Sequence, residues 1–313
     1  MTAQTPPAKP AGPTCRGCGS SATSLVGTKH GAFIHRDFSF WRCADCEITF
    51  VEPFPGYDAY DEAYYQGRGA DPYVSYEEEY RDYRATHRAL EFEDLWRLAS
   101  GYITRNLPEG TVEWLDFGCG AGGFLKFLAE ARECRSGGRA WPLRLSGHDI
   151  GAYADRLRDR DGFRIVGMEE LKSEGTGTYD VISMIEVVEH LEYPDPVFAL
   201  AARLLKPGGL LLVTTGNLSS PVARARGLGY AYYLPEIHVS FFNPRALEHV
   251  FARHGLEPVR FQYDGAVRFK VIKTLRSPGK QRLAQLLMAL PGVVRVVDAL
   301  YGTSRMPCAR KPG

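Results

Sequence analysis

Residues 112–128, VEWLDFGCGAGGFLKFL, decide the fold of this chain. The apolar run over 112–117 has the length of a buried strand. Four glycines lie within the next six residues, and apolar side chains then recur at helical spacing from Phe124 to Leu128. Glycine lets the backbone take positive φ and lets a ligand approach closely. The stretch therefore predicts a strand, a tight loop and a helix, with backbone N–H groups that face a ligand.

An aspartate before the glycines restricts the kind of ligand that the loop suits. A loop of the dinucleotide-binding type, G-x-G-x-x-G, receives a pyrophosphate. Asp116 would repel a diphosphate and attract a cation, such as the amino group of S-adenosylmethionine (SAM). The loop resembles motif I of the class I SAM-dependent methyltransferases, and another Rossmann-like nucleotide binder is the alternative. The resemblance implies that four residues cradle the methionine end of SAM: Asp116, Gly118, Gly120 and Gly122.

Three later stretches continue the pattern in the same order. They are LRLSGHDI (143–150), YDVISMIEVVEHL (179–191) and LLKPGGLLLVTT (204–215). Together with the glycine loop they resemble the class I methyltransferase family over residues 110–275. This resemblance implies an α/β fold with a doubly wound, seven-stranded, Rossmann-like sheet that is parallel except for one late strand.

The resemblance also assigns site residues beyond the glycine loop. Asp149, at the tip of the second strand, would hold the ribose hydroxyls of SAM. Met184 to Glu186 would lie beside the methyl group. The 33-residue step from Asp116 to Asp149 is longer than usual for such folds, which predicts an insertion within 131–142.

Four cysteines near the N-terminus predict a metal site. Two C-x-x-C pairs, 24 residues apart, supply the four soft ligands that tetrahedral Zn²⁺ prefers: Cys15, Cys18, Cys43 and Cys46. Apolar residues around the second pair predict short strands that pack on the metal. We expect a structural zinc ribbon over 15–56, and a redox dithiol is the alternative. Such a ribbon could cover a substrate or dock a partner.

The remaining segments divide the chain further. Eight tyrosines between Tyr57 and Tyr83 accompany a helical pattern from Ser75 to Ile103. These helices either cover one edge of the core, or bring Tyr64 or Tyr65 over the cofactor. A Gly- and Tyr-rich segment after the fifth strand predicts a substrate lid. The expected organisation is a disordered tail (1–14), the ribbon (15–56), a helical bridge or cap (57–105), a SAM-binding core (106–275) with its lid (217–239), and a C-terminal helical tail (276–313).

Two terminal parts of the core and tail carry weaker patterns. Residues 259–263 and 267–275 alternate as a final β-hairpin around Asp264-Gly265. Residues 280–301 are apolar at helical spacing but contain Pro291 and Gly292. This segment predicts a helix packed on the core or a homodimer contact, and the alternative is an amphipathic helix on a membrane surface.

Composition bounds the partners and the compartment. The chain has 313 residues, 44% hydrophobic content and a formal net charge of +1. Nucleic acid is therefore disfavoured as a partner. We see no secretory leader and no apolar run of transmembrane length. Together with the paired C-x-x-C motifs, these features predict a protein of the reducing cytoplasm.

Two histidines are candidates for the chemistry. His190 follows the fourth strand and His238 follows the lid, and either could accept a proton from a hydroxyl acceptor. The alternatives are a packing role for His190 and a lid-anchoring role for His238. Glu186, Glu189 and His190 are similar to the E-x-x-E-H element of ubiquinone-biosynthesis O-methyltransferases and small-RNA 2′-O-methyltransferases. That resemblance implies a divalent ion, Mg²⁺ or Mn²⁺, held by these three residues near the acceptor, with His238 as a further candidate ligand.

The sequence thus predicts a SAM-dependent methyltransferase with a small-molecule or glycan-intermediate acceptor, methylated on a hydroxyl. Methylation of carbon or nitrogen on a sugar nucleotide or other metabolite is an alternative. Two further alternatives are an RNA methyltransferase that uses the ribbon as a clamp, and a SAM-binding module without catalysis.

Overall fold

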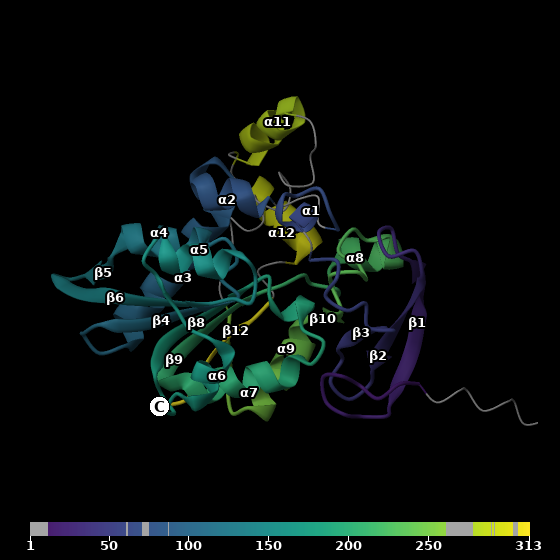
Figure 1. The fold of residues 1–313 in the computed structure, drawn as a ribbon, viewed down its shortest axis with the longest axis horizontal. Coiled ribbons are helices and arrows are strands. Elements are labelled where there is room, and N and C mark those ends of the chain that lie inside the picture. Colours follow the sequence, from purple (N-terminus) through teal and green to yellow (C-terminus); the bar gives the residue numbers. More distant parts are fainter. Residues whose placement is uncertain are drawn as a thin grey trace, which may run out of the picture.

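The structure, a computed structural model, describes residues 12–60, 62–70, 75–86, 88–260, 278–288, 290, 292–302 and 306–313 (Figure 1). A large mixed sheet with helices on both faces forms the body of the molecule, and a small antiparallel sheet lies at one end. The predicted α/β fold with an N-terminal cysteine-bearing sheet is confirmed.

The large sheet has the order β11-β12-β9-β8-β4-β6-β5, and β7 also pairs with β6. In the order β7-β6-β4-β8-β9, each strand runs parallel to its neighbours. β12 is antiparallel to both β9 and β11. These seven strands form the predicted doubly wound sheet. The eighth, β5, forms a hairpin with β6 in the predicted insertion. The strands are β4 (Val112–Phe117), β5 (Glu133–Ser136), β6 (Arg139–His148), β7 (Arg164–Ile165), β8 (Tyr179–Ile185), β9 (Leu205–Thr214), β11 (Glu257–Val259) and β12 (Cys308–Arg310).

The strand antiparallel to β9 comes from the end of the chain. The sequence predicted a final β-hairpin over 259–263 and 267–275, but residues 261–277 lie outside the described residues. Ala309 pairs with Leu211 instead, and both side chains are buried. The C-terminal segment 276–313, expected as a helical tail, contains two helices and then ends in β12, which joins the core sheet. Three residues without a β-branched side chain give little strand signal.

Six helices cover the two faces of the large sheet (Figure 1). Phe92 and Phe124 pack into the core of one face, and Phe198 and Phe251 into that of the other. On the first face lie α3 (Arg88–Asn106), α4 (Gly123–Ala131) and α5 (Tyr153–Asp159). On the second face lie α6 (Met168–Ser173), α7 (Pro194–Leu204) and α9 (Pro244–Arg253). Burial on both faces explains the continuous apolar runs in β4 and β8.

The small sheet joins the ribbon to the body. Its order is β1-β2-β3-β10, and β10 comes from the segment that follows the lid. Ser240 pairs with Phe50, and Phe241 with Thr49. The strands are β1 (Thr23–His30), β2 (Asp37–Cys43), β3 (Thr49–Glu52) and β10 (Ser240–Phe241). The last strand of the ribbon's sheet, β10, therefore comes from a segment nearly 190 residues later in the chain than β3.

Short helices fill the connections. The predicted helix from Ser75 to Ile103 is divided at Thr86, where η1 ends and α3 follows. In the lid segment, the hydroxyl of Ser220 caps α8 by accepting the N–H of Ala223. These elements are α1 (Glu62–Tyr65), α2 (Tyr76–Asp82), η1 (Tyr83–Ala85), η2 (Val188–His190), α8 (Pro221–Arg226), η3 (Gly227–Gly229), α11 (Pro278–Met288) and α12 (Val293–Tyr301).

Within the described residues, no single helix has both the length and the hydropathy to cross a bilayer. The two segments 282–288 and 293–301 reach that threshold only when taken together, and they meet at an angle of 105°.

Candidate functional site

A cavity of about 900 Å³ opens at the carboxyl ends of the parallel strands. Gly118 follows β4, Asp149 follows β6 and Glu186 follows β8, and all three line it. This is the edge at which open α/β sheets bind ligands. The lid segment contributes Tyr232 and His238 to the opposite wall.

The glycine loop brings bare backbone to this cavity. Gly118 and Gly120 line it, with φ of 77° and 51°. A Cβ on Gly120 would come within 2.8 Å of the Tyr76 ring, and one on Gly118 within 2.5 Å of Val187. Gly122 adopts φ of 76° as the N-cap of α4 but does not line the cavity, and its missing Cβ makes room for Leu157. The loop therefore fits a ligand that needs close backbone approach.

Asp116 lies beneath the loop and not in the cavity wall. Its carboxylate is buried and accepts the Ser183 hydroxyl at 2.6 Å, across the β4–β8 pair. Burial raises the pKa of Asp116 to about 7, against the opposing effect of the Ser183 hydrogen bond. The acids that do line the cavity are Glu79, Asp149 and Glu186. Asp116 is thus placed behind the cavity wall, and its predicted role in holding the methionine end of SAM stays a prediction.

Asp149 lies at the end of the second strand, β6, as predicted, and it also hydrogen-bonds the glycine loop. One carboxylate oxygen accepts the N–H of Gly120 at 2.8 Å, and the other accepts the N–H of Gly151 at 2.6 Å. Asp149 thereby fixes the glycine loop while its side chain faces the cavity. Met184 is fully buried and does not line the cavity, whereas its neighbour Ile185 does, because successive side chains of a strand point to opposite faces.

Five tyrosines form a wall over the glycine loop, which we call the tyrosine cover: Tyr57, Tyr60, Tyr64, Tyr65 and Tyr76. The Tyr64 ring centroid lies 4.8 Å from that of Tyr60 and 5.5 Å from that of Tyr76. Tyr64 and Tyr65 both line the cavity, which favours the interpretation that they close over a ligand. The bridge is thus more than a cover for the core's edge.

Two histidines meet on the lid side of the cavity. Their ring centroids are 4.9 Å apart. Nδ1 of His190 lies 3.0 Å from the Ile237 carbonyl oxygen, and Nδ1 of His238 lies 2.8 Å from the Tyr232 carbonyl oxygen. A carbonyl oxygen only accepts, so each contact is a hydrogen bond when Nδ1 carries the proton, and Nε2 then carries the lone pair. The Tyr60 hydroxyl, 2.8 Å from Nδ1 of His190, orients that ring further.

Glu189 completes this cluster from a buried position. Oε1 accepts the Tyr232 hydroxyl at 2.6 Å, and Oε2 has no hydrogen-bond partner among the described residues. Burial and the nearby Glu186 raise the pKa of Glu189 to about 8. The ligand atoms of Glu189, His190 and His238 all lie within 4.8 Å of one another. Three residues named from the sequence are therefore brought together, with Glu186 close by.

A family model described as "Methyltransferase domain" matches residues 79–260, more than half of the chain. The protein belongs to this methyltransferase-domain family. The match begins at Glu79 in α2 and ends after β11, so it contains the glycine loop, Asp149 and both histidines.

Two curated relatives of the methyltransferase domain carry the name ubiquinone biosynthesis O-methyltransferase. That of Caulobacter vibrioides is 31% identical over 157 residues, which cover 47% of this chain and 59% of the relative. That of Xanthomonas oryzae is 30% identical over 146 residues, which cover 44% of this chain and 56% of the relative. The chain thus spans little more than half the length of these relatives.

Solved methyltransferase structures are also similar to this chain. One is a geranyl diphosphate C-methyltransferase from Streptomyces coelicolor, with a TM-score of 0.42 and 15% identity, covering 69% of this chain and 80% of that one. Another is a SAM-dependent methyltransferase from Archaeoglobus fulgidus, with a TM-score of 0.41 and 19% identity, covering 70% and 98%.

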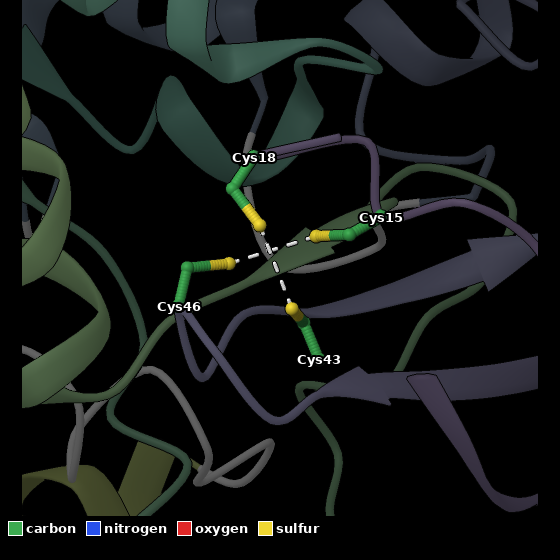
Figure 2. Close-up of side chains that lie close together, drawn as sticks. All are labelled: Cys15, Cys18, Cys43 and Cys46. Carbon is green, nitrogen blue, oxygen red and sulfur yellow. Dashed lines mark hydrogen bonds between the residues drawn. The ribbon is translucent and has the colours of Figure 1, made fainter. Parts of the chain in front are cut away.

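The four cysteines of the ribbon lie outside the matched methyltransferase domain and point at one another (Figure 2). Sγ of Cys15 lies 3.5 Å from that of Cys46, and the Sγ atoms of Cys18 and Cys43 are also 3.5 Å apart. Four thiolates around Zn²⁺, each bonded at about 2.3 Å, would lie roughly 3.8 Å apart. The donor set and spacing therefore fit a tetrahedral zinc, and all four ligand positions belong to protein, as in structural sites.

Two residues that line the cavity, Glu79 and Arg88, were not predicted from the sequence. Arg88 lines the cavity and pairs with Glu79 at 3.4 Å and with Glu91 at 3.5 Å. Glu79 stands last in a run of three glutamates, and Arg88 is one of several arginines nearby. Helical periodicity places Glu79 on the buried side of α2, but nothing in the chain marks it as a neighbour of the glycine loop.

Proposed function

We propose that this protein transfers a methyl group from SAM to a hydroxyl of a small-molecule or glycan-intermediate acceptor. One observation carries the proposal. A single cavity joins the glycine loop, at Gly118 and Gly120, to the histidine cluster of His190 and His238. A methyl donor on the loop and an acceptor beside the histidines would then share one enclosed space.

The cavity wall supports SAM as the donor. Bare backbone at Gly118 and Gly120 admits a closely fitting ligand, and Glu79, Asp149 and Glu186 provide negative charge for a cation. Bound SAM would supply the reactive methyl group. The tyrosine cover would lie over it and exclude water.

His190 is our candidate for the group that takes the acceptor's proton. Its Nδ1–H is directed at the Ile237 carbonyl, so Nε2 has the lone pair needed by a general base. Tyr60 holds the ring in this orientation. His238, with the same tautomer, would position the acceptor from the lid side.

The lining favours a neutral acceptor with aromatic or apolar character. Tyrosines from the tyrosine cover and the lid, together with aliphatic side chains, make up much of the wall. Its arginines are Arg88 and Arg226, and Arg88 already pairs with two glutamates. A sugar nucleotide needs charge for its diphosphate, so this alternative has less support than a small hydroxylated molecule.

A divalent metal bound by Glu189, His190 and His238 is a second candidate role for the cluster. Both histidines direct Nδ1–H at a backbone carbonyl, as metal-ligating histidines do. Glu189 Oε2 is buried without a hydrogen-bond partner among the described residues. Two imidazoles with one carboxylate suit Mn²⁺ better than Mg²⁺, which prefers oxygen. In this case Nε2 of His190 would bind metal and would not act as a base.

We also propose that the protein works in the cytoplasm. The seven cysteines form no disulfide within the described residues, which is typical of a reducing compartment. An RNA acceptor held by the ribbon is the rival enzyme, and the near-neutral charge of +1 argues against it.

The test combines SAM binding with turnover. Wild-type protein, given methyl-labelled SAM and fractions of a cell extract, should label a small molecule. His190→Ala should retain SAM binding by calorimetry and lose about 10²-fold or more of the turnover. His30→Ala, an exposed histidine on the ribbon, is the matched control. Binding of a nicotinamide or flavin dinucleotide in place of SAM would refute the proposal, and SAM binding without turnover would favour the non-catalytic module.

The metal alternative has its own readout. Titration of the zinc-loaded protein with Mn²⁺, followed by electron paramagnetic resonance, should report a bound ion if the second role holds. Glu189→Gln should then weaken binding, whereas Glu236→Gln, at another buried glutamate, should not. If Mn²⁺ does not bind and activity persists in chelator, the base role of His190 is retained.

A further inference from the structure

The most concentrated exposed apolar surface of the protein lies on its C-terminal helices. Twelve large hydrophobic side chains are exposed in the described chain, and six of them belong to α11, α12 and the residue between them. Their exposed fractions are 57% for Leu283, 70% for Leu286, 47% for Leu287, 53% for Leu290, 64% for Val296 and 47% for Leu300. Exposed apolar side chains gathered in this way mark an interaction surface.

These helices use little of their apolar surface within the fold. Met288 and Val294 form a small separate cluster with Val293 and Val297. α12 packs on α8, and the Asn217 side chain donates to the Gly302 carbonyl at 2.7 Å, which fixes the end of α12 to the lid segment. α11 stands at the outer edge of the molecule (Figure 1). The leucines of α11 are thus presented outward from an anchored base.

The charge on α8, α11 and α12 is mainly positive. Arg224 and Arg226 on α8, Arg282 on α11 and Arg295 on α12 are exposed and make no ion pair within the described part of the chain. Asp298 is the sole acid in the sequences of these three helices. Leucine beside arginine on a surface helix is the pattern of helices that lie in the interface of an anionic bilayer.

We propose that α8, α11 and α12 form a docking surface for an anionic lipid membrane. The leucines would enter the acyl boundary and the four arginines would meet lipid phosphates. Val222 and Arg226 of α8 and Tyr301 of α12 also line the cavity, so docking would set the cavity mouth against the bilayer. The inference does not depend on methyl transfer, since membrane binding is measured without SAM or acceptor.

A second copy of this chain fits the surface less well. A two-fold interface places the same patch against itself. The four arginines of one copy would then face the four of the other, with one Asp298 per copy to offset them. Anionic phosphates offer the opposite charge, and this is why we assign the surface to lipid.

The experiment measures binding of the full-length, zinc-loaded chain to vesicles by flotation. We expect binding to phosphatidylcholine vesicles that contain phosphatidylglycerol, weaker binding without it, and a decline as salt is raised. Leu283→Gln with Leu286→Gln should lower the partition coefficient about tenfold or more. Arg282→Gln with Arg295→Gln should lower it about fivefold per arginine, and only on anionic vesicles.

A matched control distinguishes vesicle binding through this face from nonspecific adsorption through any exposed apolar residue. Leu25→Gln with Val26→Gln changes two exposed apolar residues on β1 of the ribbon and should leave vesicle binding unchanged. Circular dichroism and SAM binding check that each variant is folded. The proposal is overturned if the wild type does not bind anionic vesicles, or if the β1 variant loses binding as much as the α11 variant. It is also overturned if light scattering shows a dimer that the α11 variant dissociates while vesicles are not bound.

Discussion

Gly120 is the residue of the loop at which a side chain would meet the tyrosine cover. Its φ is 51°, and a Cβ would press on the Tyr76 ring, part of the tyrosine cover. Gly120→Ala should therefore displace Tyr76 and lower SAM affinity about tenfold, equivalent to about 1.4 kcal/mol. Calorimetry measures this. Gly162→Ala is the matched control, because Gly162 has φ of 73° but open space around its Cβ, and equal losses in both variants would contradict the prediction.

Asp116 makes stability depend on pH in a defined direction. Its pKa rises from 3.8 to about 7 on folding, mainly through burial. Between these values the folded state holds a proton that the unfolded state releases, so the free energy of unfolding falls as pH rises through this window. Asp116→Asn keeps an acceptor for Ser183 without the charge.

Urea unfolding between about pH 5 and pH 8 checks this prediction. The slope of unfolding free energy against pH should be shallower in Asp116→Asn than in wild type. Asp155→Asn, at an exposed aspartate on α5, is the control and should keep the wild-type slope. If Asp116→Asn also keeps that slope, Asp116 is not the titrating group.

The site residues divide according to what a local pattern can specify. Gly118, Gly120 and Asp149 line the cavity because loop and strand end are fixed by local sequence. The sequence assigned Asp116 and Met184 to the site, but the next residue of each strand, Phe117 or Ile185, lines the cavity instead. An apolar run does not show which of two successive side chains points to the cavity. The ion pair of Glu79 with Arg88 joins α2 to α3, and such a contact follows only from tertiary packing.

At the scale of elements, β10 connects the zinc site to the histidine cluster. The Val51 N–H donates to the Val239 carbonyl at 3.1 Å, and the Val239 N–H donates to the Glu189 carbonyl at 2.8 Å. His238 is the neighbour of Val239. Strand β4 was predicted with its observed bounds, whereas β10, with two residues, falls below the length at which alternation can be recognised.

Zinc removal should consequently loosen the lid side of the cavity. Structural zinc contributes about 10–16 kcal/mol to folding in small zinc modules, so its loss should release β3 from β10. Hydrogen exchange after chelation should show lost protection at Val51 and Val239, with Leu115 in β4 still protected. Reconstitution with Zn²⁺ is the control. Unchanged exchange at Val239 in zinc-free protein would show that the body holds β10 unaided.

At the scale of the whole molecule, the divisions expected along the chain do not coincide with the sheets. β12 lies between β9 and β11, so the last residues form an inner strand of the large sheet, next to its edge. Removal of residues 303–313 should leave β9 and β11 unpaired on that side and prevent soluble expression or lower the melting temperature sharply. Removal of residues 1–11, part of the predicted disordered tail, is the control. A stable, folded chain that ends at Gly302 would contradict this prediction.

The pairing of Phe50 with Ser240 also bears on the order in which the chain is assembled during synthesis. The two partners are 190 residues apart, so the N-terminal sheet stays incomplete until most of the polypeptide has left the ribosome. The four cysteines emerge long before that moment and can take up their ion first. A metallated but unfinished ribbon would then wait for its last strand, and metal supply early in translation would govern the yield of native protein.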